Sequence, residues 1–158
     1  PYAEFTIGGI ADRSYRADGD EGQFSTQYTL DDFSGHVELS LAWWNEDFSE
    51  TPEIDFVIDE NLAPGEYEVT FLQRDQGGNR RLQEGQSVAA LFSYDLQSEE
   101  IAFVATNVSG TLNIDIDEQG KIFGTFNITG TDDAGTEATA EGMFEYLRNE
   151  SAGLFVES

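Results

Sequence analysis

Apolar and polar residues alternate one by one along most of this sequence, as in β-strands with one buried and one solvated face. In the segment 36–44, Val37, Leu39, Leu41 and Trp43 alternate with small or acidic residues. No segment keeps the 3.6-residue period of an amphipathic helix over three turns. The pattern therefore predicts an all-β protein.

Turn-forming residues divide the alternating stretches into about ten short strands, with Gly, Pro, Asn or Asp gathered between them. The predicted strands are 3–7, 23–30, 36–44, 53–59, 66–72, 88–96, 101–106, 111–117, 121–129 and 138–147, followed by a short segment at 154–156. Such strands are typical of a single antiparallel β-sandwich or flattened β-barrel. Because no change in composition divides the 158 residues, we predict one β domain over residues 1–158.

The charge balance restricts the partners that this chain can bind. It has 32 acidic and seven basic residues, a formal charge of -25, and Lys121 is its single lysine. A surface this negative repels phosphate backbones and anionic lipids. We therefore expect no nucleic-acid binding and no direct membrane insertion. No stretch approaches the ~18 apolar residues of a membrane span. The composition suits a saline setting, and most acidic residues are expected on a solvated surface.

The absence of cysteine excludes thiol catalysis, disulfides, and cysteine-based zinc or iron–sulfur sites. His36 is the single histidine, and no G-x-S-x-G nucleophile motif accompanies it, so we expect an ordinary surface or strand-edge residue there. Paired carboxylates such as Asp55 and Glu68, expected on the outward faces of adjacent strands, leave a glycoside hydrolase as a distant alternative. The alternation places them in water, and the prediction is therefore a protein without catalytic activity.

Two acidic loops are candidate calcium sites, because calcium takes six to eight oxygen ligands. The first loop carries Asp18, Asp20 and Glu21, and the second carries Asp132 and Asp133. Solvated turns are the simpler interpretation of both loops. The sequence indicates no other cofactor.

The dipeptide Trp43–Trp44 is the most informative aromatic feature. Because neighbouring residues of a strand point to opposite faces, a buried Trp43 implies that Trp44 faces outward. An exposed tryptophan could stack on a sugar ring or dock another chain, whereas a loop over residues 45–52 could instead fold over Trp44 and bury it. Phe48 in that loop is a second candidate contact residue.

Three of the basic residues, Arg74, Arg80 and Arg81, gather in one loop after the predicted strand 66–72. On so acidic a protein this loop could pair with a negative patch on the next copy, in a head-to-tail assembly. Pairing within the chain, with Asp75 or Glu84, is the ordinary alternative.

Several segments share a sequence pattern of Gly and Thr with alternating apolar residues. They are Val108–Ser109–Gly110–Thr111–Leu112–Asn113–Ile114, Gly124–Thr125–Phe126–Asn127–Ile128, Glu141–Gly142–Met143–Phe144, Ala3–Glu4–Phe5–Thr6–Ile7–Gly8–Gly9 and Gly65–Glu66–Tyr67. This pattern resembles that of the strands in small secreted bacterial lipoproteins of unknown function. The resemblance implies an exported all-β domain and brings no catalytic residues, and the cysteine that carries the lipid in that family is absent here.

Together these features predict a non-catalytic protein, extracellular, on the outer cell surface or in the periplasm, that acts by contact. Its partners would be other copies of itself or another surface macromolecule, with Trp44, Phe48, Arg74, Arg80 and Arg81 as contact residues. The alternative is a glycan-binding module that uses Trp44 and a calcium loop. Because the chain begins with Pro1 rather than Met, we expect a processed or trimmed chain, from which a targeting segment could already have been removed.

Overall fold

The computed structural model describes residues 2–17, 23–31, 36–59, 62–74, 76–78, 80–147 and 154–157. Within these residues the chain forms twelve β-strands and a short 3₁₀ helix, η1 (Gln97–Glu99). The strands are β1 (Tyr2–Gly8), β2 (Arg13–Arg16), β3 (Gln23–Asp31), β4 (His36–Trp44), β5 (Glu50–Asp59), β6 (Gly65–Phe71), β7 (Val88–Leu96), β8 (Ile101–Val104), β9 (Asn107–Ile116), β10 (Lys121–Thr131), β11 (Glu137–Leu147) and β12 (Leu154–Glu157). The predicted all-β class is confirmed.

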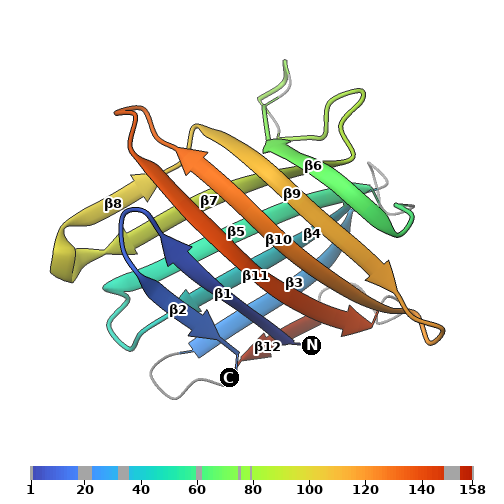
Figure 1. Ribbon diagram of the computed structural model, residues 1–158, viewed down its shortest axis with the longest axis horizontal. Helices are drawn as coiled ribbons and strands as arrows, with labels where there is room; N and C mark the ends of the chain where they lie inside the picture. Colours follow the sequence, from blue (N-terminus) through green and yellow to red (C-terminus); the bar gives the residue numbers. More distant parts are fainter. Residues whose placement is uncertain are drawn as a thin grey trace.

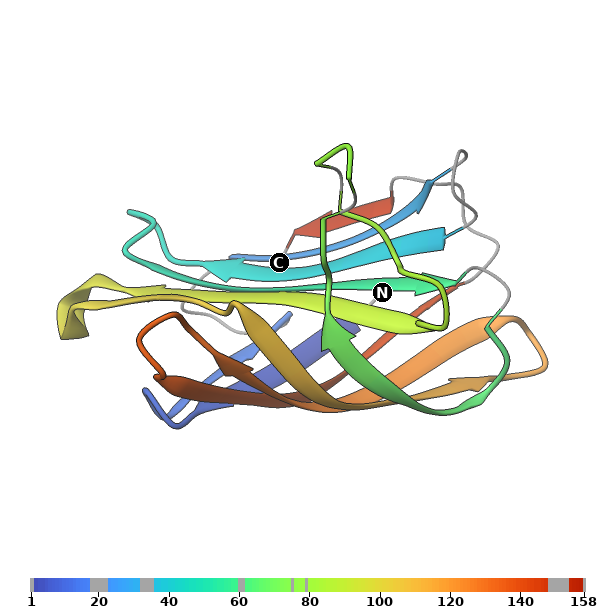
Figure 2. The same ribbon diagram turned by 90° about the horizontal axis from the view of Figure 1, so that it is seen from above.

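All of these strands belong to one sheet, in the order β12-β3-β4-β5-β7-β6-β9-β10-β11-β1-β2, with β8 paired to β7. The pairs are antiparallel except β6 and β7, which run parallel over residues 69–71 and 88–90. The sheet folds over at this pair into two facing layers, one from β12 to β7 and the other from β6 to β2 (Figures 1 and 2). The result is a nearly closed, flattened barrel, as predicted, with one parallel pair that the alternation did not indicate.

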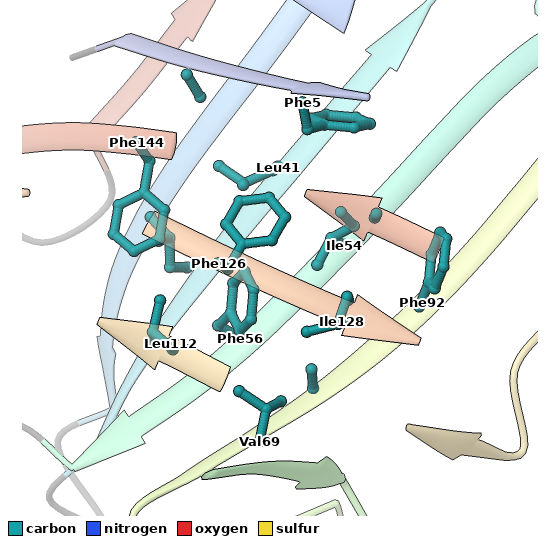
Figure 3. Packing of buried hydrophobic residues seen from close by; sticks show 14 of the residues in the cluster. Phe5, Leu41, Ile54, Phe56, Val69, Phe92, Leu112, Phe126, Ile128 and Phe144 are labelled. Carbon is teal, nitrogen blue, oxygen red and sulfur yellow. The ribbon is translucent and has the colours of Figure 1, made fainter. Parts of the chain in front are cut away.

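The two layers enclose an aromatic-rich hydrophobic core. Figure 3 shows Leu41, Ile54, Phe56 and Phe92 from one layer, with Phe5, Leu112, Phe126, Ile128 and Phe144 from the other. The rings of Phe56 and Phe126 lie 5.1 Å apart at 62°, an edge-to-face arrangement that joins the layers. Gly124 makes room for this packing, because a Cβ atom there would overlap the ring of Phe144. Burial of each large side chain contributes about 1.5–3 kcal/mol.

A second, smaller apolar cluster lies on the outer side of β5 and β7. Val57 and Ala89 point out of the barrel there, and the segment that connects β6 to β7 covers them with Leu72 and Leu82. The outer face of this layer is therefore partly buried, contrary to the predicted division into one apolar and one polar face.

The predicted strands agree closely with the observed ones, and the bounds of β4 and β7 are identical to those predicted. β2 was not predicted, and β5 begins at Glu50, inside the segment that we expected to be a loop. His36 is 8% exposed at the start of β4, so the expected surface position is wrong. In the part of the chain that the structure describes, no helix is long and apolar enough to cross a membrane.

Candidate functional site

The turn between β4 and β5 presents two aromatic rings to the surface. Trp44, at the end of β4, is half-buried, and Phe48 in the turn is 62% exposed. Their ring centroids lie 6.4 Å apart, with the planes 10° from parallel. The turn therefore folds toward Trp44, which was one of the two alternatives predicted from the sequence. The ring that covers Trp44 is that of Phe48, which is itself exposed.

Phe48 has a backbone φ of 59°, a left-handed conformation that is rare for a bulky residue and costs of the order of 1–3 kcal/mol. Hydrogen bonds hold the turn in this shape. Asn45 Nδ2 donates to Ser49 Oγ at 2.9 Å, and Ser49 Oγ donates to Asp47 Oδ1 at 2.6 Å. The Ser49 hydrogen bonds lower the pKa of Asp47. The amide of Gln97 donates to the Ser49 carbonyl oxygen at 2.9 Å, which attaches the turn to η1.

A buried polar cluster joins the end of the sheet at β2 to the opposite layer. The hydroxyl oxygens of Tyr15 in β2 and Tyr94 in β7 lie 2.6 Å apart, and Tyr15 donates to Glu50 Oε1 at 2.9 Å. Because the one hydroxyl proton of Tyr15 goes to Glu50, Tyr94 must be the donor in the Tyr15–Tyr94 bond. The ring of Trp43 packs against Tyr15 with a centroid distance of 4.8 Å.

The Tyr15–Tyr94–Glu50 cluster forms a structural clasp between the two layers of the barrel. Burial is the largest cause that raises the pKa of both tyrosines, so both phenols stay protonated at neutral pH. Arg13 lies 3.8 Å from Glu50 and 3.7 Å from Glu99, and Glu50 is the main cause that raises its pKa. Among the described residues, β2 has no backbone pairing with the opposite layer. The clasp therefore links β2 to that layer through side chains.

Asp55 is the most perturbed carboxyl group in the described residues. It lies half-buried on the outer face of β5, and Ser40 Oγ in β4 donates a short hydrogen bond to its Oδ1. Burial raises the pKa of Asp55 to about 7, the negative charges of Glu53 and Glu38 raise it further, and the hydrogen bond from Ser40 opposes this rise. Asp55 therefore exchanges a proton near neutral pH.

The two carboxylates weighed for hydrolysis are not neighbours. Asp55 lies on β5 and Glu68 on β6, and β7 runs between these strands in the sheet. The predicted placement of Asp55 and Glu68 on adjacent strands is therefore wrong.

A pocket of about 810 Å³ lies beside β1, β2 and β11. It is lined by Glu4, Phe5, Thr6, Ser14, Tyr15, Arg16, Trp43, Phe126, Glu141 and Gly142. The aromatic members are almost fully buried, while the two carboxylates, the guanidinium and Ser14 are exposed. The volume lies in the range of small-molecule sites. Trp43, and not Trp44, borders this pocket.

The arginine loop is held mainly by bonds to its own backbone. Arg74 Nη1 donates to the Gly78 carbonyl oxygen at 2.8 Å, and Arg80 Nη1 donates to that of Leu72 at 2.6 Å. The Arg80 guanidinium lies 5.4 Å from the ring centroid of Phe71, and burial lowers its pKa. Arg80 thus stabilises the loop, while Arg74 and Arg81 are exposed.

The candidate calcium loops are described only in part. Asp18, Asp20 and Glu21 lie outside the described residues. Asp132 Oδ1 accepts hydrogen bonds from the amides of Ala134 and Thr136, at 3.0 and 2.9 Å, which closes the turn between β10 and β11, and Asp133 is exposed. No three His, Asp or Glu side chains in the described ranges are grouped to hold a metal ion. Calcium binding stays a prediction.

The clasp is the feature that sequence reasoning missed. Tyr15 and Tyr94 are 79 positions apart, and β2 was not expected as a strand. The one available signal was the alternation in Arg13–Arg16, where Tyr15 is the apolar member.

Comparisons with known proteins add no assignment to this geometry. No family model matches the chain, and neither a curated protein nor a solved structure matches it at a significant level.

Proposed function

We propose that this protein is a non-catalytic contact protein, secreted or displayed on a cell surface, that binds other copies of itself through the turn between β4 and β5. The exposed Phe48 carries this proposal. A bulky aromatic residue in a left-handed conformation costs stability, and exposure of its ring to water gains nothing for the free protein. Burial of the ring against a partner removes its apolar surface from water and offsets the cost of the strained backbone.

The surroundings of Phe48 support a role as an anchor. Its ring stacks on Trp44, and the hydrogen-bonded turn fixes its position before any partner arrives. A ring that is already ordered loses little conformational entropy on binding. Aromatic anchors of this kind typically carry much of the energy of protein interfaces.

Charge indicates which surface of the next copy receives the turn. Glu46 and Asp47 directly precede Phe48 and are exposed, while Arg74 and Arg81 are exposed in the loop after β6. In Figure 1 the β4–β5 turn lies at the lower left and this loop at the top, away from the turn. One copy can therefore contact two neighbours at once, which gives a head-to-tail chain rather than a closed dimer.

The proposal is tested by sedimentation velocity over a range of protein and salt concentrations. The wild type should associate, and more strongly once salt screens the repulsion between copies of charge -25. Phe48→Ala should stay monomeric under the same conditions. Val104→Ala is the matched control, because Val104 is the other large hydrophobic residue exposed in the described chain, at 65%.

The double substitution Arg74→Glu/Arg81→Glu tests the receiving surface and should weaken association. A wild type that is monomeric at every salt concentration would overturn the proposal. Equal association of Phe48→Ala and wild type would do the same.

The alternative is a glycan-binding module centred on Trp44. The stacking of Phe48 makes it less favourable, because a sugar would meet the Phe48 ring rather than Trp44.

A further inference from the structure

The strand β8, at the upper left of Figure 1, presents a free sheet edge. It pairs with β7 along one edge and, among the described residues, with no strand along the other. The amide of Ala105 donates to the Phe92 carbonyl oxygen at 2.9 Å, so these two residues form a hydrogen-bonded pair of the antiparallel ladder. Because such pairs alternate along a strand, the N–H and C=O groups of Ala102 and Val104 point away from β7.

These outward backbone groups have no partner in the part of the chain that the structure describes. No hydrogen bond there reaches the N–H or C=O group of Ala102 or Val104. Thr106, the next residue that points the same way, does have one, because its amide donates to the Thr131 carbonyl oxygen in the opposite layer at 2.8 Å. Both side chains are also exposed, that of Val104 at 65%. The edge therefore directs paired donors and acceptors, and an apolar side chain, toward solvent or a partner.

β8 lacks the features that normally prevent a free edge from pairing with another chain. Natural proteins protect such edges with charged side chains, proline or a bulge. β2, the last strand of the sheet, has Arg13 and Arg16 among its four residues. The four residues of β8 are Ile, Ala, Phe and Val, without charge or proline, in a chain in which 25% of the residues are charged. This edge can therefore accept an added strand.

The charge around the edge indicates which strand it accepts. Glu100 directly precedes β8 and is exposed, and Asp133, two residues after Thr131, is exposed beyond the other end. Asp95 of β7, also exposed, lies opposite Ala102. A second copy of this edge would bring further negative charge to these groups, whereas a basic peptide meets opposite charge at each end.

We propose that β8 binds an extended basic peptide of another protein as an added antiparallel strand. The N–H and C=O groups of Ala102 and Val104 form the hydrogen bonds of the new ladder, and Val104 contacts an apolar side chain of the peptide. In this mode of recognition the main-chain hydrogen bonds supply much of the affinity. The partner differs from the second copy that we place at the Phe48 turn, so neither proposal depends on the other.

The test is fluorescence anisotropy with the labelled peptide Lys-Thr-Val-Val-Val-Thr-Lys, capped at both ends. The wild type should bind it, and more weakly as salt screens the charges. The same peptide with Glu in place of both Lys residues should bind at least about tenfold more weakly. NMR hydrogen exchange locates the contact, because bound peptide should slow exchange at the amides of Ala102 and Val104, which face solvent in the free protein.

A variant and a modified peptide test the backbone bonds separately. Val104→Pro removes an outward donor and no bond to β7, so the strand should persist and binding should weaken at least about tenfold. Val104→Ala keeps the backbone groups and should lose less. A peptide N-methylated on its first and third valines lacks the donors that face β8 and should not bind, whereas one N-methylated on both threonines keeps them and should bind. Phe48→Ala should bind as the wild type does.

Four results would overturn the proposal. They are no binding of the basic peptide, equal binding of the acidic peptide, equal binding by Val104→Pro and wild type, and equal binding of the two methylated peptides. Slow exchange at Ala102 and Val104 that grows with protein concentration, without peptide, would assign the edge to a second copy and would also refute it.

Discussion

The half-buried Asp55 makes the stability of this protein depend on pH in a direction unusual for an aspartate. Its ordinary pKa is 3.8, and in the folded protein burial raises it to about 7. The folded state therefore binds a proton more tightly than the unfolded state between these two values. The free energy of unfolding contributed by this group is greatest below about pH 4 and falls as the pH rises to about 7.

The size of this effect follows from the two pKa values. Each pH unit of difference corresponds to about 1.4 kcal/mol, so a difference of about three units sets an upper bound of about 4 kcal/mol. Asp55 is only partly buried, and solvent screening reduces this figure to about 2 kcal/mol. The main cause is burial, so added salt should change the effect little.

Asp55→Asn isolates this contribution, because asparagine is uncharged at every pH and its carbonyl oxygen can accept the hydrogen bond from Ser40. Urea denaturation of both proteins from pH 4 to pH 8 gives the difference in their free energies of unfolding. The variant should equal the wild type within about 1 kcal/mol near pH 4 and exceed it by about 2 kcal/mol at pH 8. A direct NMR titration of the Asp55 carboxyl carbon should give a midpoint near 7.

Asp95→Asn is the matched control, because Asp95 is an exposed aspartate on the neighbouring strand β7. Its substitution should change the free energy of unfolding by less than about 0.5 kcal/mol across the range. A constant difference between Asp55→Asn and wild type from pH 4 to pH 8 would refute the reasoning. A variant less stable than wild type at pH 8 would refute it too.

Two further predictions concern packing and the clasp. Tyr15→Phe leaves the buried Tyr94 hydroxyl without its acceptor and should lower the free energy of unfolding by about 1–3 kcal/mol, measured by urea denaturation. Tyr2→Phe, which removes an exposed hydrogen bond, should cost less than about 1 kcal/mol, and equal losses would contradict the role of the clasp. Gly124→Ala should lower the melting temperature through overlap with the Phe144 ring, at a cost of about 1–3 kcal/mol, and an unchanged melting temperature would show that the ring can move away.

The strands were predictable because each of them carries its own signal. β4 has unbroken alternation of large apolar residues on its inner face, and its bounds follow directly from it. β2 has only four residues, and three of them are exposed, so its sequence holds a single apolar residue, Tyr15. The position of Tyr15 depends on partners in β5 and β7, and a local pattern contains no information about them.

The candidate site was predictable only in its residue types. Trp44 and Phe48 were expected as contact residues, and the structure brings their rings together. The stacking of the two rings depends on the left-handed backbone conformation of Phe48. The conformational preferences of phenylalanine do not predict it. The raised pKa of Asp55 depends on burial of the outer face of β5, which the alternation had assigned to water.

The connection between β6 and β7 shows why strict alternation failed on that outer face. Parallel neighbours need a crossover of about a dozen residues or more, and the chain between Phe71 and Val88 supplies one. A crossover must run over one face of the sheet, and this one places Leu72 and Leu82 on Val57 and Ala89. The consecutive apolar residues at 56–58 and 88–92, which break the two-residue period, are therefore buried on both faces of the sheet. The sequence held two signals of this crossover: a long gap between predicted strands, and apolar runs without alternation. Only the two together indicate a segment that covers the outer face of the sheet.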